Sequence, residues 1–446
     1  LGDIVHLHMP GMSVVVVNSE SVATELLDRR GNIYSSRRKA VSLEMIGLEP
    51  DLGFLPYHLP LFNKHRRIFQ KHFSRKAIAS YRPLVASCTY NLLKDFLARP
   101  HDYDEHILRF ALIIPYKAGF GFDIENDDEM SQISRIALKV INDIPELSLV
   151  DFVPALRHLP GWLPGASDAK RARKLRPLVR KIFDYPFEAL KKQFDVSSVH
   201  LTDRISHLLG EEYKLGIEAK EDPSELAFSL AGVGGTIISA GVDTVWTTLA
   251  FAVIFLAMNP EIQRTAQAEL DNVLKGVRLP DFDDQSSLPY IDCIVMEIER
   301  ATIPAVHHLS TADDVYNGYF IPKGTVVLPN VKAISRDGRV YKDPERFNPA
   351  RFLPKPHGGG EPPFTAGFGY GRRICPGRHL ANAELFIAVA SILTVFDIQP
   401  VVNSNGVEIK PELKLSSGFV RHPKPVACEV RPRSPAFARL LQDNIR

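Results

Sequence analysis

The chain has 446 residues, of which 45% are apolar and 24% are charged, values typical of a globular protein with a large core. Its 54 lysines and arginines nearly balance its 52 aspartates and glutamates, so a net charge of +2 gives no reason to expect nucleic-acid binding. The four cysteines are far apart and lack the spacing of a zinc site or a disulfide framework. They indicate thiols in a reducing compartment.

The first 21 residues, "LGDIVHLHMPGMSVVVVNSES", predict two short strands around a Pro-Gly turn. Helical patterns then dominate, including a helix over 21–31 that closes on Gly31 and one over 80–100 that closes on Pro100. No internal repeat or shift in composition marks a boundary, so we expect one catalytic domain over residues 1–446.

The stretch 227–258 is apolar enough to span a bilayer and contains a single charge, Asp243. As a helix it would be about 48 Å long at roughly 1.5 Å per residue, which also suits the centre of a large globular domain. It includes Ser239 and four threonines, lacks a basic N-terminal flank and ends at Asn259-Pro260. We therefore expect a buried central helix rather than a membrane span.

Three later features complete the expected organisation. Residues 166–183 predict a helix with one basic face, which either is solvated or contacts an anionic membrane surface. A helix over 289–300 precedes short strands, and Asn317-Gly318 predicts a tight hairpin. The chain is thus expected to be mainly α, with a small sheet built from distant segments.

One cysteine stands in an unusual environment, "GFGYGRRICPG" at 367–377. Arg372, Arg373 and Arg378 lie close to Cys375 in sequence, the glycines let backbone N–H groups approach it, and a predicted helix begins just after it. These features favour a thiolate over a thiol. No base for a nucleophile and no resolving cysteine lies nearby, which favours a metal ligand.

Phe368, Gly371, Arg373, Cys375 and Gly377 fit the pattern F-x-x-G-x-R-x-C-x-G, in which the chain resembles the cytochrome P450 family. The resemblance implies a mainly α fold with a small β lobe and a long central helix over haem b. It implies that the Cys375 thiolate is the axial ligand of the iron, which makes bound oxygen easier to cleave. Arg373 would then pair with a haem propionate and Phe368 would pack near the sulfur, in a loop shaped by Gly371 and Gly377.

The motif "AGVDT" at 240–244 resembles the oxygen-activation stretch of the same family. The resemblance implies that Gly241 permits a local widening of the helix over the haem. Thr244 would hydrogen-bond the oxygen or water at the iron, and Asp243 would relay protons. Small residues and a threonine in a buried helix are more often packing residues, but their place before the cysteine matches the family.

"EIER" resembles the E-x-x-R motif of the family, with Glu297 and Arg300 one helical turn apart. An arginine from a downstream loop completes this cluster in the family. "PERF" offers Arg346, but the full spacing P-x-x-F-x-P-x-R-F selects Arg351. The resemblance thus implies a structural triad of Glu297, Arg300 and Arg351, which specifies the core behind the haem.

Other positions agree with the family less closely. Arg66 matches W-x-x-x-R as a second propionate partner, but Phe62 replaces Trp and removes an indole N–H. His308 matches a histidine that contacts a propionate, or else it is a surface residue before a strand. The segment between Arg300 and His308 is a few residues short and Ala350 replaces Glu. Either the pocket wall is reshaped or the sequence is defective or incomplete.

The resemblance implies a monooxygenase that inserts one atom of O2 into an apolar substrate, lipid-like, terpenoid or aromatic. Electrons would come from NADPH through NADPH-cytochrome P450 reductase, docked near Arg372 and Arg378. A haem-thiolate isomerase, dehydratase or peroxygenase would need no reductase, and the pair Asp243-Thr244 argues against it. A non-catalytic haem-binding membrane protein is the other alternative. The expected pocket segments are 41–59, 237–248, 302–306 and 417–420.

The segments "YNGYFIPKGT" and "SSGFVRHPKP" most resemble the fungal microsomal branch of the family, which is often found in secondary metabolism. In that branch a membrane helix precedes the first strand and holds the enzyme on the cytosolic face of the endoplasmic reticulum. We expect the same location, with the anchor outside the present sequence, and a monomeric protein.

Overall fold

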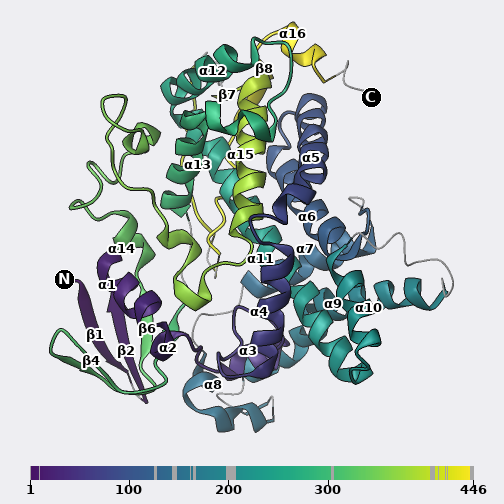
Figure 1. Cartoon of the computed structure of the whole chain (residues 1–446), viewed down its shortest axis with the longest axis vertical. Helices are drawn as coiled ribbons and strands as arrows, with labels where there is room; N and C mark the ends of the chain where they lie inside the picture. The colour runs from purple at the N-terminus through teal and green to yellow at the C-terminus, as the bar shows by residue number, and fades with distance from the viewer. Residues whose placement is uncertain are drawn as a thin grey trace.

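The computed structural model describes residues 2–9, 11–124, 128–142, 148–160, 162–163, 167–196, 207–302, 306–401, 407–409, 411–416, 418 and 420–441, and helices predominate in them (Figure 1). The helices before the central one are α1 (Glu20–Ala23), α2 (Gly31–Tyr34), α3 (Val41–Ile46), α4 (Pro60–His72), α5 (Ile78–Ala98), α6 (Tyr103–Phe120), α7 (Glu129–Asn142), α8 (Leu149–Phe152), α9 (Ser167–Val196) and α10 (Leu208–Glu218). The remainder are α11 (Pro223–Met258), α12 (Pro260–Leu274), α13 (Pro289–Thr302), α14 (Val331–Ser335), α15 (Arg378–Val395) and α16 (Pro435–Arg439).

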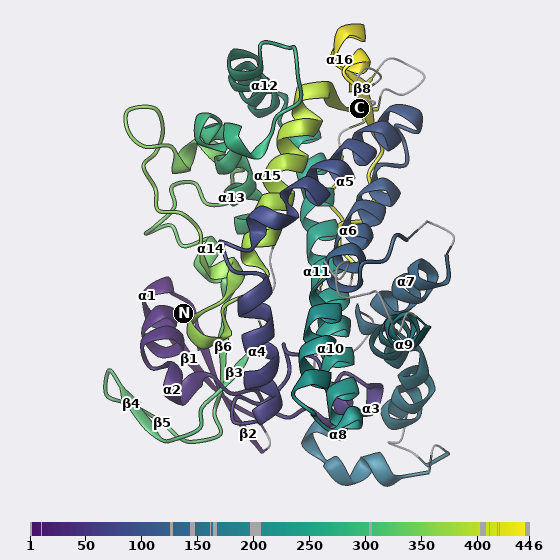
Figure 2. The same ribbon diagram turned by 45° about the vertical axis from the view of Figure 1, so that its right-hand side comes forward.

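The long apolar stretch forms α11, which runs through the middle of the helical part of the molecule (Figures 1 and 2). Pro223 occupies its first turn and the Asp222 carboxylate accepts hydrogen bonds from two free N–H groups there, which fixes the start. Pro260 ends it. Among the described residues, α11 and α15 are long and apolar enough to cross a membrane, but 72% and 67% of their most apolar parts are buried inside the protein. The expected buried central helix is confirmed.

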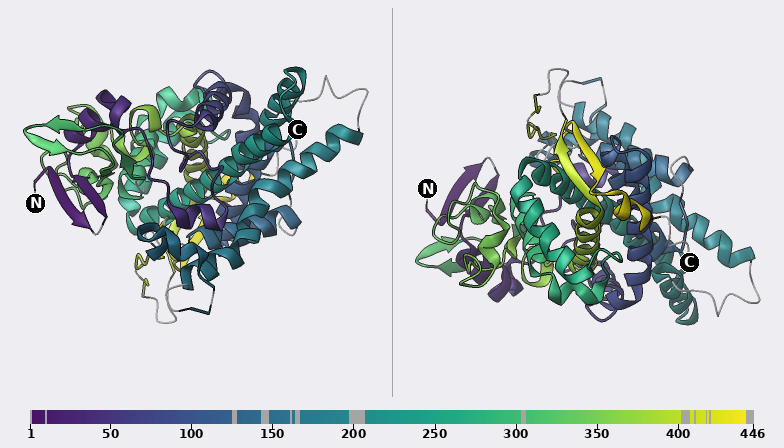
Figure 3. Two further views of the ribbon diagram at one scale, coloured as in Figure 1. Left: turned by 90° about the horizontal axis from the view of Figure 1, so that it is seen from below. Right: turned by 90° about the horizontal axis from the view of Figure 1, so that it is seen from above.

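A small lobe combines the N-terminal strands with strands from the second half of the chain, as expected. Strands β1 (Ile4–Met9), β2 (Met12–Val17), β6 (Val326–Pro329) and β3 (His308–Leu309) form a sheet in the order β1-β2-β6-β3. β2 and β6 are parallel, with Val14 opposite Val326, and the other pairs are antiparallel. Seen from below and above, this lobe lies to one side of the helices (Figure 3).

Two further antiparallel strand pairs lie outside this sheet. β4 (Asp314–Tyr316) and β5 (Tyr319–Ile321) are joined by Asn317 and Gly318, whose φ angles of 49° and 80° fit the predicted tight turn. β7 (Phe396–Pro400) pairs with β8 (Cys428–Pro432) beyond the end of α15. The sheet lobe, the hairpin and the predicted helices over 80–100 and 289–300 therefore agree with the sequence patterns.

The helix expected over 21–31 is wrong in its C-terminal boundary. α1 passes into a π-helical turn, Thr24–Arg29, and Gly31 begins α2 instead of ending the first helix. Leu26, Leu27 and Tyr34 are completely buried in the core of the small lobe. Packing of these neighbouring side chains therefore overrides the local stop signal of the glycine.

The basic stretch forms the first part of α9, and Lys170, Arg171, Arg173 and Lys174 are exposed there. Val179 and other apolar residues of the helix are buried. The basic face is thus an exposed one. Contact of this face with a membrane stays a prediction.

Candidate functional site

A cavity of about 270 Å³ lies against α11, α15 and the loop that carries Cys375. Helices α4 and α6 contribute further lining residues. Each expected pocket segment supplies part of the wall, through Asp51 to Gly53, the α11 residues from Ile237 to Thr248, Thr302 and Val420. Residues 303–305, 417 and 419 of the expected segments lie outside the described residues.

Cys375 lines this cavity, whereas Cys428 lies on β8 and the other described cysteines are buried elsewhere. The Cys375 N–H donates to the Phe368 carbonyl oxygen at 2.7 Å, which closes the loop just before α15. Phe368 and Gly377 also line the cavity. Of the described cysteines, Cys375 alone combines the sequence motif with access to the cavity.

The ionisation expected for Cys375 needs a correction. The Gly377 and Arg378 N–H groups and the charges of Arg66 and Arg378 act to lower its pKa, but burial outweighs them and raises the pKa above the ordinary value. Arg372 instead donates to the Tyr57 hydroxyl at 2.6 Å. A metal cation would reverse the balance, because a coordinating thiol is deprotonated outright.

Three guanidinium groups, the buried Arg37 and Arg373 and the half-buried Arg66, line the cavity without an ion pair to any described residue. Arg373 donates to the carbonyl oxygens of Ser35 and Leu55, each at 2.6 Å. Burial lowers the pKa of Arg373 to about 8 and that of Arg37 to about 9. Haem b carries two propionate groups, and these anions would compensate the buried charges. The residues therefore fit the cofactor.

Sequence reasoning missed Arg37. Its Nε donates to the Gly53 carbonyl oxygen at 3.0 Å, and its Nη1 donates to the carbonyl oxygens of Val306 and His307. The neighbouring Arg38 faces Asp151 and Phe152 instead. Two adjacent arginines look alike in the sequence, so only the direction of the chain at this point distinguishes them.

Phe62 and Arg66 lie on α4 beside the Cys375 loop. The Arg373 guanidinium lies 4.0 Å from the centre of the Phe62 ring, so Phe62 keeps an aromatic contact although it lacks the indole N–H of Trp. Arg66 Nη1 donates to the Ile374 carbonyl oxygen at 2.7 Å. This bond joins α4 to the residue that precedes Cys375.

His308 is buried on β3 and is not a surface histidine. Its Nδ1 lies 2.8 Å from the Tyr34 carbonyl oxygen. Burial and the nearby Arg37 charge hold the pKa of His308 well below its usual range. His308 is not among the residues that line the cavity, but the charges of Arg37 and Arg373 act on it.

The oxygen-activation stretch lies on α11 with Gly241 and Thr244 at the cavity wall. The Thr244 hydroxyl donates to the Ala240 carbonyl oxygen at 2.7 Å. α11 is α-helical throughout, so the widening expected at Gly241 is not present. Pro115 packs beside Gly241, and a Cβ there would lie 3.4 Å from its ring, which leaves little room on that side.

Asp243 is buried beside this wall, and the Asn142 side-chain amide donates to its Oδ2 at 2.9 Å. Its Oδ1 has no hydrogen-bond partner among the described residues. Burial raises the pKa of Asp243 to about 6. Asn142 also accepts from the Val420 N–H at 3.1 Å and thus joins Asp243 to the C-terminal segment of the cavity wall. No local sequence pattern indicates this role for Asn142.

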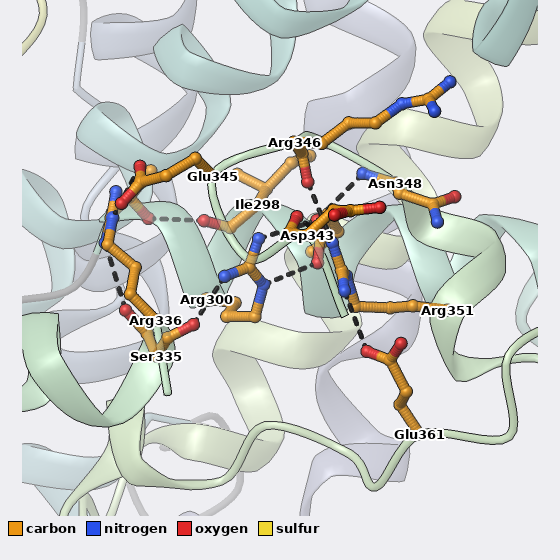
Figure 4. A network of polar contacts seen from close by, with 12 residues as sticks. Ile298, Arg300, Ser335, Arg336, Asp343, Glu345, Arg346, Asn348, Arg351 and Glu361 are labelled. Carbon is orange, nitrogen blue, oxygen red and sulfur yellow. Dashed lines mark hydrogen bonds and ion pairs between the residues drawn. The ribbon is translucent and has the colours of Figure 1, made fainter. Parts of the chain in front are cut away.

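The structure brings Glu297 and Arg300 of α13 together with Arg351 of the turn Pro349–Phe352. Arg300 Nε donates to Glu297 Oε2 at 2.8 Å and Arg351 Nε donates to Glu297 Oε1 at 3.2 Å. Arg351 also donates to Glu361 at 2.8 Å. The side chain of Arg346 points away from this cluster (Figure 4), and only its carbonyl oxygen takes part, accepting from Arg351 at 2.9 Å.

A long helix packed against a cavity that contains one cysteine, with a buried Glu-Arg-Arg cluster behind it, defines a haem-thiolate protein. The sequence model for cytochrome P450 matches residues 1–430, and the chain belongs to this family. It is a cytochrome P450 monooxygenase with a haem held by a cysteine thiolate.

Named relatives and solved structures agree with this assignment. Cytochrome P450 monooxygenase COX2 of Coprinopsis cinerea is 33% identical, over 99% of this chain and 85% of the relative. Tryptamine 4-monooxygenase of Psilocybe cyanescens is also 33% identical, over 97% of this chain and 86% of the relative. A zebra fish cytochrome P450 solved with progesterone is 25% identical, with a TM-score of 0.78 over 97% of this chain and 96% of that chain.

Proposed function

We propose that this chain inserts one oxygen atom from O2 into an apolar small molecule, lipid-like, terpenoid or aromatic, and that Cys375 would hold the iron of its haem. The observation that carries the proposal is a single cavity lined by Cys375, by Thr244 and by three arginines, two of them buried, that have no anionic partner among the described residues. The remaining wall is largely apolar, with Ile237, Val245 and other aliphatic and aromatic residues. An apolar wall of this kind selects substrates by burial of apolar surface.

The chain's own residues would hold the cofactor and direct protons. Arg37, Arg66 and Arg373 would bind its propionates. The Phe62 ring would hold the Arg373 guanidinium in place by packing against it. The bound haem supplies the oxygen chemistry, and thiolate ligation favours O–O cleavage. The Thr244 hydroxyl now donates to a carbonyl of its own helix and can turn to donate into the cavity instead.

Asp243 would deliver protons to this wall. Its raised pKa of about 6 keeps a useful fraction protonated near neutral pH, which suits a proton donor. Its buried Oδ1 has no hydrogen-bond partner among the described residues and could hold the proton, whereas the Asn142 amide holds Oδ2 in place.

The reductase would dock over a second hollow of about 640 Å³, on the other side of the Cys375 loop. Its lining includes Arg66, Arg75, Arg372 and Arg378, a concentration of positive charge in a chain that is nearly neutral overall. A partner with an acidic surface would be steered there. NADPH-cytochrome P450 reductase is the proposed partner, because its electrons would enter close to Cys375.

Further proposals concern organisation and location. The described elements share one central helix, which supports a single catalytic domain over residues 1–446. Location on the cytosolic face of the endoplasmic reticulum and a monomeric state rest on the resemblance to the fungal microsomal branch. Separation of cell membranes, followed by detection of the protein in the microsomal fraction, tests the location.

The decisive experiment uses the protein purified with haem, reduced and exposed to CO. We expect a strongly red-shifted Soret band in the wild type and in Cys428→Ser, and loss of this band in Cys375→Ser. An unshifted band in the wild type, or the same band in Cys375→Ser, would contradict the proposal. Product formation from an apolar substrate with peroxide but never with NADPH and reductase would instead favour a peroxygenase.

A further inference from the structure

Asp51 places a buried carboxylate on the wall of the cavity, in the loop between α3 and α4. Its side chain is turned toward α11, the helix that carries Thr244. Glu384 is another carboxylate on the cavity wall, but it lies on α15, the helix that follows Cys375. Of these two carboxylates in the cavity wall, Asp51 is the one that contacts α11.

Two neutral donors hold this carboxylate in position. The Gly53 N–H donates to Oδ1 at 2.8 Å and the Ser239 hydroxyl donates to Oδ2 at 2.8 Å. The next residue, Leu52, donates its N–H to the Thr236 hydroxyl oxygen at 3.1 Å. The loop is thus fixed to α11 through the carboxylate itself and through the backbone of the next residue. Each carboxylate oxygen keeps a second direction for a further donor.

No cation compensates the charge of Asp51 among the described residues. Arg37 donates to the carbonyl oxygen of Gly53, the same residue whose N–H binds Asp51, but Arg37 and Asp51 form no ion pair. Burial raises the pKa of Asp51, as expected for a carboxylate without a positive partner. A cation in the cavity would remove this penalty, whereas a neutral ligand would not.

Asp51 also lies at a suitable distance along α11 from Thr244, where oxygen would be inserted. Ser239 precedes Thr244 by five residues, which corresponds to about 8 Å along the helix at roughly 1.5 Å per residue. Ala240 and Thr244 are one helical turn apart, and both line the cavity. A substrate whose charged end lies at Asp51 would therefore extend its apolar part along this wall toward Thr244.

We propose that Asp51 binds the cationic nitrogen of an otherwise apolar substrate, so that the enzyme prefers apolar amines or ammonium compounds to neutral molecules of the same shape. This inference rests on the proposed function of the cavity and adds the charge of the substrate. The cationic group binds to the carboxylate, and the apolar remainder reaches the position where oxygen is inserted.

The test compares two probes of one shape. Trimethyl(phenylpropyl)ammonium carries a permanent charge and has no lone pair with which to ligate iron, and its neutral isostere has a tert-butyl group in place of the trimethylammonium group. Affinities are measured with the haem-loaded protein by equilibrium dialysis and by the Soret shift that accompanies binding. We expect the wild type to bind the ammonium compound more tightly than the isostere.

Two variants separate the charge from the loop contact. Asp51→Asn removes the charge but keeps the size and one acceptor oxygen, and we expect it to reduce the preference for the ammonium compound by at least about tenfold. Ser239→Ala keeps the charge but removes the hydroxyl that holds it, and the preference should persist. If Asp51 only fastens the loop, both variants should weaken both probes alike.

The outcomes also separate this inference from the proposed function. If the reduced CO complex of the wild type lacks the red-shifted Soret band, the proposed function fails. If that band is present but the wild type prefers the neutral isostere, the inference about Asp51 alone is wrong. Should Asp51→Asn fail to take up haem, the probe preference of the wild type and of Ser239→Ala still decides the question.

Discussion

Replacement of Arg351 by Met tests whether the buried cluster is held by this arginine. Arg351 is completely buried and donates to Glu297, to Glu361 and to the carbonyl oxygens of Lys342 and Arg346. Removal of one partner of a buried ion pair costs about 3–5 kcal/mol. Arg300 and the Asn348 N–H still bind Glu297, so we expect a loss near the lower end, about 3 kcal/mol.

Arg346→Met is the matched control, because it changes the same residue type in the same loop. The Arg346 side chain is exposed and points away from the cluster (Figure 4), so its loss should cost no more than about 0.5 kcal/mol. At about 2.1 cal/mol/K of unfolding entropy per residue, a loss of 3 kcal/mol lowers the melting temperature of a chain this long by about 3 °C. Thermal unfolding followed by circular dichroism measures the difference.

A double-mutant cycle between Arg351→Met and Glu297→Gln then measures the pair itself. We expect the two changes to be non-additive by about 1–3 kcal/mol, because each leaves the other charge without its partner. Equal melting temperatures for the Arg351 and Arg346 variants would refute the reasoning. Additive effects in the cycle would show that Arg351 stabilises the loop through its backbone contacts alone.

Three further predictions concern the cavity and the fold. Arg37→Leu should stabilise the haem-free protein, because it removes a buried charge, and yet accelerate haem loss to apomyoglobin by about tenfold or more, because it removes a propionate partner. Arg38→Leu should have neither effect. Asp243 has a pKa near 6 in the folded chain and about 4 when unfolded, so its contribution to stability falls as the pH rises between these values. Asp243→Asn should therefore stabilise the protein at pH 7, by up to about 3 kcal/mol, with no gain in urea denaturation below pH 4. Gly371→Ala should destabilise the protein more than Gly324→Ala. Both glycines have a positive φ, but a Cβ at Gly371 would lie 2.6 Å from a backbone carbonyl oxygen, whereas Gly324 faces open space. Equal decreases in melting temperature would contradict this.

Much of the site could be predicted from the sequence because its parts are local. The loop around Cys375 is a run of consecutive residues, and "AGVDT" and "EIER" each occupy about one helical turn. The choice of Arg351 over Arg346 also followed from spacing, and the contacts of Glu297 agree with it. The apolar stretch before Asn259 identified the central helix in the same way.

Other properties arise only where distant segments meet. The sequence by itself indicated the loop around Cys375, the helical turn with Thr244 and the partners of Glu297, because a metal-binding loop and a helical turn require fixed residue types at fixed spacings. The tertiary structure decided that Arg37 rather than Arg38 enters the cavity, that Asp51 stands opposite Ser239, and that burial raises the pKa of Cys375. The physical reason is that charge, desolvation and hydrogen-bond partners depend on which surfaces the folded chain removes from water, and no local pattern specifies that.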